Sequence, residues 1–170
     1  MSDIKFEKPI TPKHLVENNL MLSVPVYQRL FVWKSDQIQK LLSDLYDSCN
    51  NGLYNIGIIS IWINAKENNS WEIVDGQQRL TFLSLFAAWA VANLGAKSSV
   101  REKWHEFLFA GEKLRLHFIG RPEDEDAIKA LAGGNMPMFG SFRLFAEAAN
   151  AFFANRNGLE DLDARENFVQ

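Results

Sequence analysis

WEIVDGQQRL, residues 71–80, is the stretch that decides how this chain folds. A run of apolar and β-branched residues ends at Val74, and a long apolar segment begins at Leu80. The first run predicts a strand, and the second predicts a helix that starts at about Gln77. Five polar or flexible residues lie in the turn between these two elements: Asp75, Gly76, Gln77, Gln78 and Arg79.

The helix after this turn is expected to lie at the centre of the domain, because apolar residues occupy nearly all of its faces. The other segments predict strands and helices by their periodicity and their turn residues. Strands are expected in 20–28, 53–64, 70–76 and 113–120, with 53–64 and 70–76 forming a hairpin. Helices are expected in 35–49, 101–111, 122–134 and 141–156. The chain is therefore predicted to have an α+β fold.

The composition is that of a soluble globular protein, with 170 residues of which 47% are hydrophobic and 23% charged. A net charge of -3 gives no overall attraction to nucleic acid or to anionic lipid. Cys49 is the single cysteine, which excludes an internal disulfide and any metal site built from several cysteines. The first ten residues contain no apolar signal core. A cytoplasmic protein without a membrane span is expected.

The turn after Val74 has the residue types that bind phosphate. The first N–H groups of a helix point outward and favour an anion, and Gly76 has no side chain to keep that anion away. Gln77 and Gln78 add neutral donors, Arg79 adds a forked cation, and Asp75 is suited to hold Mg²⁺ or a water. Buried polar groups need partners, so five in a row favour a shared ligand.

An alternative explanation needs no ligand. Asp75 would cap the helix, Gly76 would only form the turn, and Arg79 would pair with a surface carboxylate. For an arbitrary D-G-x-x-R sequence this explanation is the better one. The two adjacent glutamines at the start of an apolar helix are harder to explain in this way.

A second group of polar residues lies in VPVYQRLFVW, residues 24–33. Tyr27, Gln28 and Arg29 follow Pro25 at the end of an extended segment, where a neighbouring loop could meet them. Stacking by Tyr27 and phosphate contact by Arg29 would suit a nucleotide or a DNA strand. The aromatic residues that follow, Phe31 and Trp33, are expected to pack in the core.

These two motifs resemble one family. VPVYQRLFVW, a helix containing Gln37 and Asp44, then IGIISIW and VDGQQRLTFLSLF resemble the N-terminal domain of GmrSD-type, modification-dependent restriction enzymes. The order and spacing match over about residues 20–95, and the similarity is looser beyond residue 100. Phe82 replaces a usual second threonine.

The resemblance implies a ParB/sulfiredoxin-like fold, with a small mixed sheet packed on the central apolar helix and further helices after it. It implies a nucleotide-binding core in residues 1–100 and a mostly helical extension in 101–170. It also implies binding or hydrolysis of a nucleoside triphosphate (NTP), coupled to restriction of phage or modified DNA. A separate nuclease domain or subunit would cut the DNA, and this chain would then be one module of a longer protein.

The resemblance further implies residue roles. The expected catalytic residues are Asp75, Gln78 and Arg79, with Asp75 also the expected Mg²⁺ ligand. The expected nucleotide-binding residues are Gly76, Gln77, Gln78, Arg79 and Arg29. The residues expected to contact DNA or nucleotide are Tyr27, Gln28 and Arg29. Three other functions stay open: a sensor that binds without hydrolysis, a direct nuclease acting through Asp75 and Arg29, and an interaction domain without a ligand.

Overall fold

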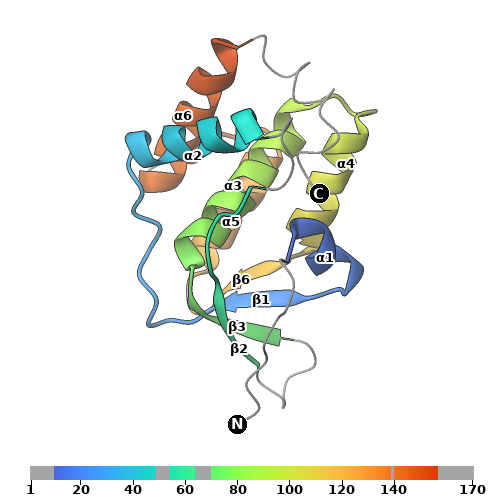
Figure 1. Cartoon of the computed structure of the whole chain (residues 1–170), viewed down its shortest axis with the longest axis vertical. Coiled ribbons are helices and arrows are strands. Elements are labelled where there is room, and N and C mark those ends of the chain that lie inside the picture. Colours follow the sequence, from blue (N-terminus) through green and yellow to red (C-terminus); the bar gives the residue numbers. More distant parts are fainter. Residues whose placement is uncertain (1–9, 49–53, 64–69, 139, 157–170) are drawn as a thin grey trace.

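The computed structural model describes residues 10–48, 54–63, 70–138 and 140–156 (Figure 1). The helices in these ranges are α1 (Pro12–Glu17), α2 (Ser35–Ser48), α3 (Gln77–Asn93), α4 (Ser99–Leu108), α5 (Pro122–Ala132) and α6 (Gly140–Ala154). The strands are β1 (Met21–Val24), β2 (Ser60–Ile63), β3 (Ser70–Asp75), β4 (Phe109–Ala110), β5 (Lys113–Leu114) and β6 (Leu116–Phe118). Cys49, the turn predicted between the hairpin strands and the chain after residue 156 lie outside the described residues.

The main sheet has the strand order β2-β3-β1-β6. β1 runs parallel to β3 and to β6, whereas β2 is antiparallel to β3. The predicted α+β fold and the predicted hairpin pairing are both confirmed. β6 comes from the region after residue 100, so the sheet contains strands from both sides of the expected domain boundary.

The topology brings the two polar motifs to one edge of the sheet. β3, β1 and β6 are parallel, so their carboxyl ends meet at the same edge. In sheets of this kind, ligands bind beyond the carboxyl ends of the strands. Residues 75–79 follow β3 at this edge, and residues 25–33 follow β1.

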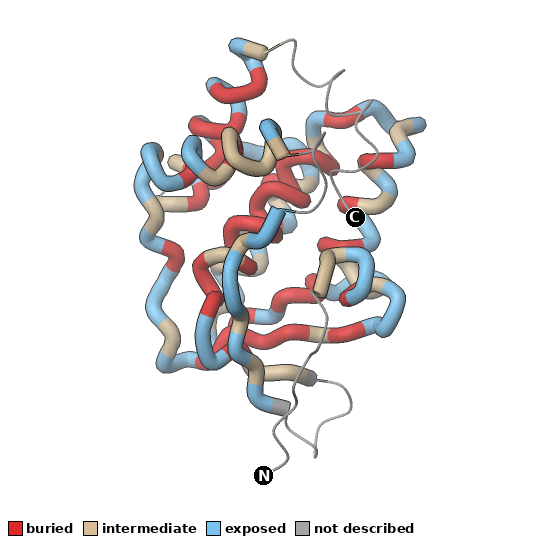
Figure 2. The backbone as a smooth tube through the Cα atoms, viewed as in Figure 1, coloured by how far each residue is buried: buried red, intermediate tan, exposed pale blue. Residues whose placement is uncertain are grey.

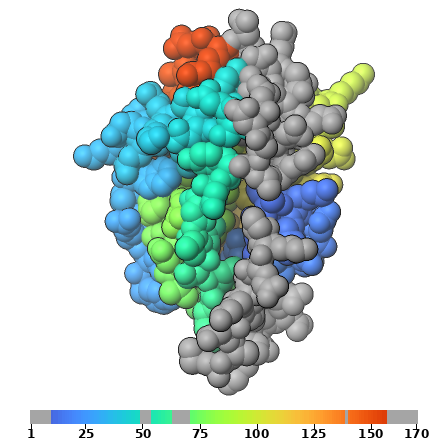
Figure 3. Space-filling model, in the orientation of Figure 1, coloured from blue at the N-terminus to red at the C-terminus, as the bar shows by residue number. Residues whose placement is uncertain are grey.

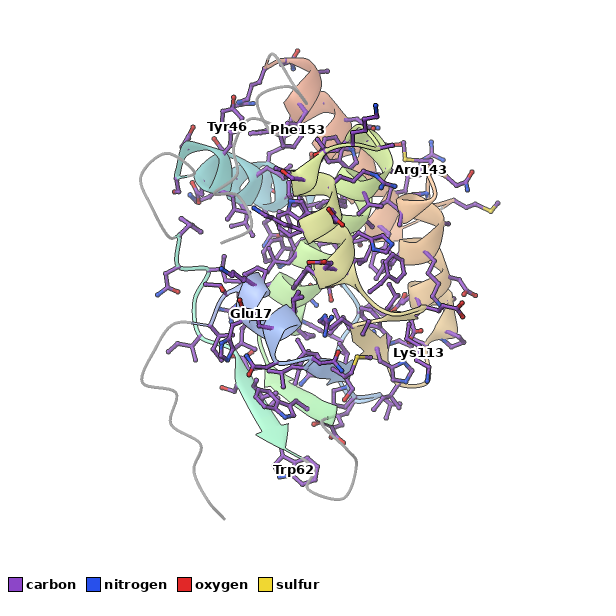
Figure 4. The ribbon with its side chains drawn as sticks, turned by 90° about the vertical axis from the view of Figure 1, so that its right-hand side faces the viewer. Glu17, Tyr46, Trp62, Lys113, Arg143 and Phe153 are labelled. Atoms are coloured by element: carbon purple, nitrogen blue, oxygen red, sulfur yellow. The ribbon has the colours of Figure 1, made fainter. Side chains whose placement is uncertain are left out.

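Helix α3 lies in the middle of the molecule, as predicted. It is buried on all sides, and it contacts α4, α5 and α6 (Figure 2). The aromatic contacts include Phe82 with Phe145 at 5.3 Å and Trp89 with Phe153 at 4.7 Å between ring centroids. Phe153 also contacts Tyr46 of α2 (Figure 4). In the described part of the chain, no helix has both the length and the apolar character needed to cross a membrane.

Three predicted strands are shorter than expected. The strand predicted over 20–28 covers only Met21–Val24, which is β1. The strand predicted over 53–64 begins only at Ser60, and the described residues before it, 54–59, have no regular strand pairing. In the space-filling view, 54–63 forms a continuous band across one face of the molecule (Figure 3). The strand predicted over 113–120 is split at Arg115 into β5 and β6, which belong to different sheets. The prediction did not include α1, although Thr11 before Pro12 is a typical helix start.

The backbone of Arg115 lies at the split between β5 and β6: its N–H donates to the carbonyl oxygen of Leu108, and its carbonyl oxygen accepts from the N–H of Leu22 in β1. Arg115 is 5% exposed, and its guanidinium donates hydrogen bonds to the carbonyl oxygens of Leu20 at 2.9 Å and Glu106 at 3.1 Å. Burial lowers the pKa of Arg115 from its ordinary value. The alternation predicted for this region is confirmed, because Leu114, Leu116 and Phe118 are all buried. Arg115 joins the sheet to α1 and α4 through backbone carbonyl groups.

Candidate functional site

The turn between β3 and α3 depends on a glycine. β3 ends at Asp75, and Gly76 has a φ of 95°, a left-handed conformation that residues with a side chain rarely adopt. A Cβ atom at position 76 would also lie only 2.9 Å from Cγ1 of Ile59. The N-cap residue of α3 is Gly76, which has no side chain, so the explanation of Asp75 as the capping residue is wrong. The side chain of Asp75 is instead 75% exposed.

The two glutamines of the turn are buried, and both are 6% exposed. The side-chain oxygen of Gln77 accepts a hydrogen bond from the backbone N–H of Gln78 at 2.7 Å. Its side-chain nitrogen lies 3.4 Å from the carbonyl oxygen of Arg29. Gln77 therefore satisfies one free N–H group of the helix start and reaches the loop that follows β1.

Gln78 binds the same loop with both ends of its amide. Its Oε1 accepts a hydrogen bond from the backbone N–H of Val32 at 3.0 Å, and its Nε2 donates to the carbonyl oxygen of Leu30 at 2.7 Å. We call the side chains of Gln77 and Gln78, with the backbone of residues 29–32, the glutamine clamp. The glutamine side chains find their partners inside the protein, so their burial no longer indicates a shared ligand.

Gln28 makes a fourth hydrogen bond between the two motifs. Its Nε2 donates a hydrogen bond of 2.7 Å to the carbonyl oxygen of Val74. The pairing of β2 with β3 is irregular here: Ser60 pairs with Asp75 and Ile61 with Ile73, so Val74 has no partner residue on β2. The loop after β1 is thus hydrogen-bonded to the end of β3 and to the start of α3.

Arg79 and Asp75 lie together at the mouth of this turn. The Arg79 Nη1 donates a hydrogen bond of 3.2 Å to the carbonyl oxygen of Ile56, and its Nη2 lies 3.9 Å from Oδ2 of Asp75. The Arg79 side chain is 25% exposed. The acid that pairs with Arg79 belongs to the same motif, so the pair places a cation and a carboxylate side by side at the helix start.

The side chains of the second motif differ in their exposure. Tyr27 is 70% exposed, and Arg29 is also exposed. Gln28 is half-buried and is hydrogen-bonded to Val74. Phe31 is buried, as predicted, and its ring lies 5.8 Å from that of Trp33. The loop therefore presents an aromatic ring and a cation to solvent, and it packs its other aromatic residues inward.

The segment 54–59 also belongs to this site, although its sequence was predicted to form only a strand. Ile56 supplies the carbonyl group for Arg79, and Ile59 packs against Gly76. Asn55, two residues before Gly57, was the available signal, because Asn-x-Gly sequences often form tight turns. Within the described residues, no group of three His, Cys, Asp or Glu side chains is arranged to hold a metal ion.

The comparisons with known proteins bear on the same region. The family model of the GmrSD restriction endonuclease N-terminal domain matches residues 12–165. A comparison with curated proteins found no match. The family match includes both polar motifs, and it extends through α4, α5 and α6, where the resemblance of the motifs alone was loose. The chain therefore belongs to the GmrSD restriction endonuclease N-terminal domain family and is part of a GmrSD-type restriction system.

Proposed function

We propose that this chain is the NTP-binding and NTP-hydrolysing module of a modification-dependent, GmrSD-like DNA restriction or phage-defence system. The observation that carries the proposal is the position of Asp75 and Arg79, side by side where the buried helix α3 starts. A triphosphate needs a cation, backbone N–H donors and a nearby carboxylate for its metal ion, and these groups come together at this point.

The backbone supports binding of a bulky anion. The first N–H groups of α3 point outward from the helix and favour an anion, while the space beside the Cα of Gly76 is filled by Ile59. The N–H of Gln78 is used by the clamp, which leaves the amides of Gly76 and Gln77 as the candidate donors. Helix α3 is 17 residues long, and its dipole adds a partial positive charge at this end.

Two arginines would bind the phosphate oxygens. Arg79 is held beside the helix start, and the guanidinium has five donor groups, of which Ile56 takes one. Arg29 lies on the loop that the clamp joins to α3, and its side chain is exposed. In hydrolysis, Arg79 and the backbone amides would offset the negative charge that develops on the transferred phosphoryl group.

Asp75 fits a role in binding Mg²⁺. Magnesium in nucleotide sites is commonly held by one or two carboxylates, with phosphate oxygens and water as the remaining ligands. One carboxylate, 75% exposed and beside Arg79, meets this requirement. Bound Mg²⁺ would neutralise charge on the phosphates, and Asp75 would hold the ion or orient the attacking water.

The proposed roles of the glutamines follow from their contacts. Gln77 and Gln78 would hold the loop with Tyr27 and Arg29 in place, and any catalytic role of Gln78 would require its amide to leave Leu30 and Val32. Tyr27 would stack on a base of the nucleotide or of DNA. Cutting of the DNA would belong to a nuclease domain or subunit.

The test is binding and hydrolysis of each of the four NTPs with Mg²⁺. Wild-type protein should bind at least one NTP at a single site and release inorganic phosphate from it, and Arg79→Ala should lose both activities. Arg101→Ala is the matched control, since Arg101 also donates one hydrogen bond to a backbone carbonyl, that of Val91, away from the turn.

Two other results would point to other functions, and a third would refute the site. Binding without phosphate release would identify a sensor. Plasmid nicking with Mg²⁺ and no nucleotide would favour a direct nuclease. Equal NTP binding by wild-type protein and Arg79→Ala would refute the proposed site.

A further inference from the structure

The segment that precedes β2 forms a tight turn against Arg79. The side-chain Oδ1 of Asn55 accepts a hydrogen bond of 2.8 Å from the backbone N–H of Gly57. Gly57 has a φ of 103°, a conformation that strains any residue with a side chain. The carbonyl group between them, that of Ile56, accepts the hydrogen bond from Arg79. We call residues 55–57 the NIG turn.

Gly57 leaves the space that the Arg79 guanidinium occupies. A Cβ atom on Gly57 would overlap Nη1 of Arg79, and it would lie 3.4 Å from Cζ. The guanidinium therefore lies directly against the backbone of the NIG turn. A side chain at position 57 and the observed position of Arg79 exclude each other.

The NIG turn is itself fixed at both ends. On one side, the Tyr54 hydroxyl donates a hydrogen bond of 3.1 Å to Oδ2 of Asp44 on α2. On the other side, Ile59 packs against Gly76. The turn is thus attached to α2 and to the start of α3, so it is a fixed surface for Arg79 to lie on.

We propose that Gly57 is a positioning residue for Arg79. Because Gly57 has no side chain, the Arg79 guanidinium can lie over the NIG turn beside Asp75. This inference rests on the proposed function. An arginine side chain has several rotatable bonds, and fixing them before the ligand arrives removes an entropic cost of binding. Gly57 would raise the affinity for a triphosphate through Arg79.

The test compares Gly57→Ala with Gly134→Ala. Gly134 also has a positive φ, 82°, but a Cβ there would meet nothing within 4 Å, so this control carries backbone strain without the contact. We expect Gly57→Ala to weaken binding of the Mg²⁺-bound NTP by about five- to fiftyfold, which lies within the roughly two- to 150-fold spanned by coupling between contacting residues. Gly134→Ala should bind like the wild type.

A double variant separates positioning from a general structural effect. In the Arg79→Ala background, Gly57→Ala should change affinity by less than about twofold, because the guanidinium that it displaces is already gone. An equal loss in both backgrounds would overturn the inference. If Gly57→Ala fails to fold, Asn55→Ala replaces it, since this change removes only the hydrogen bond that shapes the turn.

A second readout does not depend on nucleotide. The Nε–H resonance of Arg79 in an NMR spectrum reports the surroundings of the guanidinium, and it should shift in Gly57→Ala and stay unchanged in Gly134→Ala. An unchanged resonance in Gly57→Ala would overturn the positioning role. Absence of NTP binding by the wild type, together with the expected shift, would refute the proposed function while leaving the contact between Gly57 and Arg79 in place.

Discussion

Replacing Gln78 with alanine tests whether the glutamine clamp holds the loop after β1. The change removes two hydrogen bonds, one from the N–H of Val32 at 3.0 Å and one to the carbonyl of Leu30 at 2.7 Å. Each is expected to contribute about 0.5–1.5 kcal/mol. Their loss should lower the free energy of unfolding by about 2 kcal/mol, or Tm by about 4–8 °C for a chain of this size.

The assay is chemical and thermal unfolding, together with amide hydrogen exchange at Val32. Exchange at this N–H should become faster in Gln78→Ala, because its acceptor is gone. Gln78→Glu should also lose stability, since a carboxylate can accept from Val32 but cannot donate to the carbonyl of Leu30. Gln39→Ala is the control, because Gln39 is exposed on α2 and makes one long contact, 3.4 Å, to Ser35.

Two results would refute this reasoning. One is a free energy of unfolding for Gln78→Ala within about 0.5 kcal/mol of the wild type, the range typical of surface substitutions. The other is unchanged hydrogen exchange at Val32 despite a loss of stability. Either would mean that the clamp does not fix the loop.

Three further changes test other parts of the structure. In a denaturant titration, Arg115→Met should lower the free energy of unfolding by about 2–4 kcal/mol, because the carbonyl groups of Leu20 and Glu106 lose a charged donor. Arg143→Ala, on the surface of α6, should have little effect in the same titration. Gly76→Ala should lower the free energy of unfolding by about 1–3 kcal/mol, measured by thermal unfolding, since Gly76 has a positive φ and Ile59 leaves little room for a side chain. A variant as stable as the wild type would contradict this. Burial raises the pKa of Asp124, so the folded state binds a proton more readily than the unfolded state. The free energy of unfolding of the wild type, measured relative to that of Asp124→Asn, should therefore rise as the pH falls from 7 to 4. A difference that stays constant with pH would contradict this.

The parts of the fold that depend on local sequence could be predicted. The strand, the glycine turn and the central helix of residues 70–94 follow from the change of apolar pattern at Gly76. Phe31 and Trp33 were expected in the core; Phe31 is buried against Trp33, and Trp33 packs on Phe82 of α3. In each case the residue type and its immediate neighbours carry the information.

The parts that depend on distant contacts could not be predicted. The glutamines looked like ligand-binding residues because their partners, the backbone groups of Leu30 and Val32, lie 46–48 residues away in the sequence. Arg115 interrupts an alternating apolar segment, and the carbonyl of Leu20 that it binds is 95 residues away. Backbone N–H and carbonyl groups have no sequence signature, so neither arrangement could be read from the pattern.

The position of Arg79 also depends on residues that are distant in the sequence. The sequence indicated a cation at the start of α3, but it gave no reason to expect Ile56 and Gly57 beside it. Those residues were assigned to a regular strand because of their isoleucine content. The turn at Gly57 lies where that strand was expected, and it brings the backbone against the guanidinium.

The most direct test of the central claim is an NMR titration of the ¹⁵N-labelled protein with a Mg²⁺-bound NTP. If the turn between β3 and α3 binds the phosphates, the amide resonances of Gly76 and Gln77 and the Nε–H resonance of Arg79 should shift together and saturate at one ligand per chain. The amides at the end of α6 should not move. Saturable binding that leaves Gly76, Gln77 and Arg79 unshifted would contradict the claim.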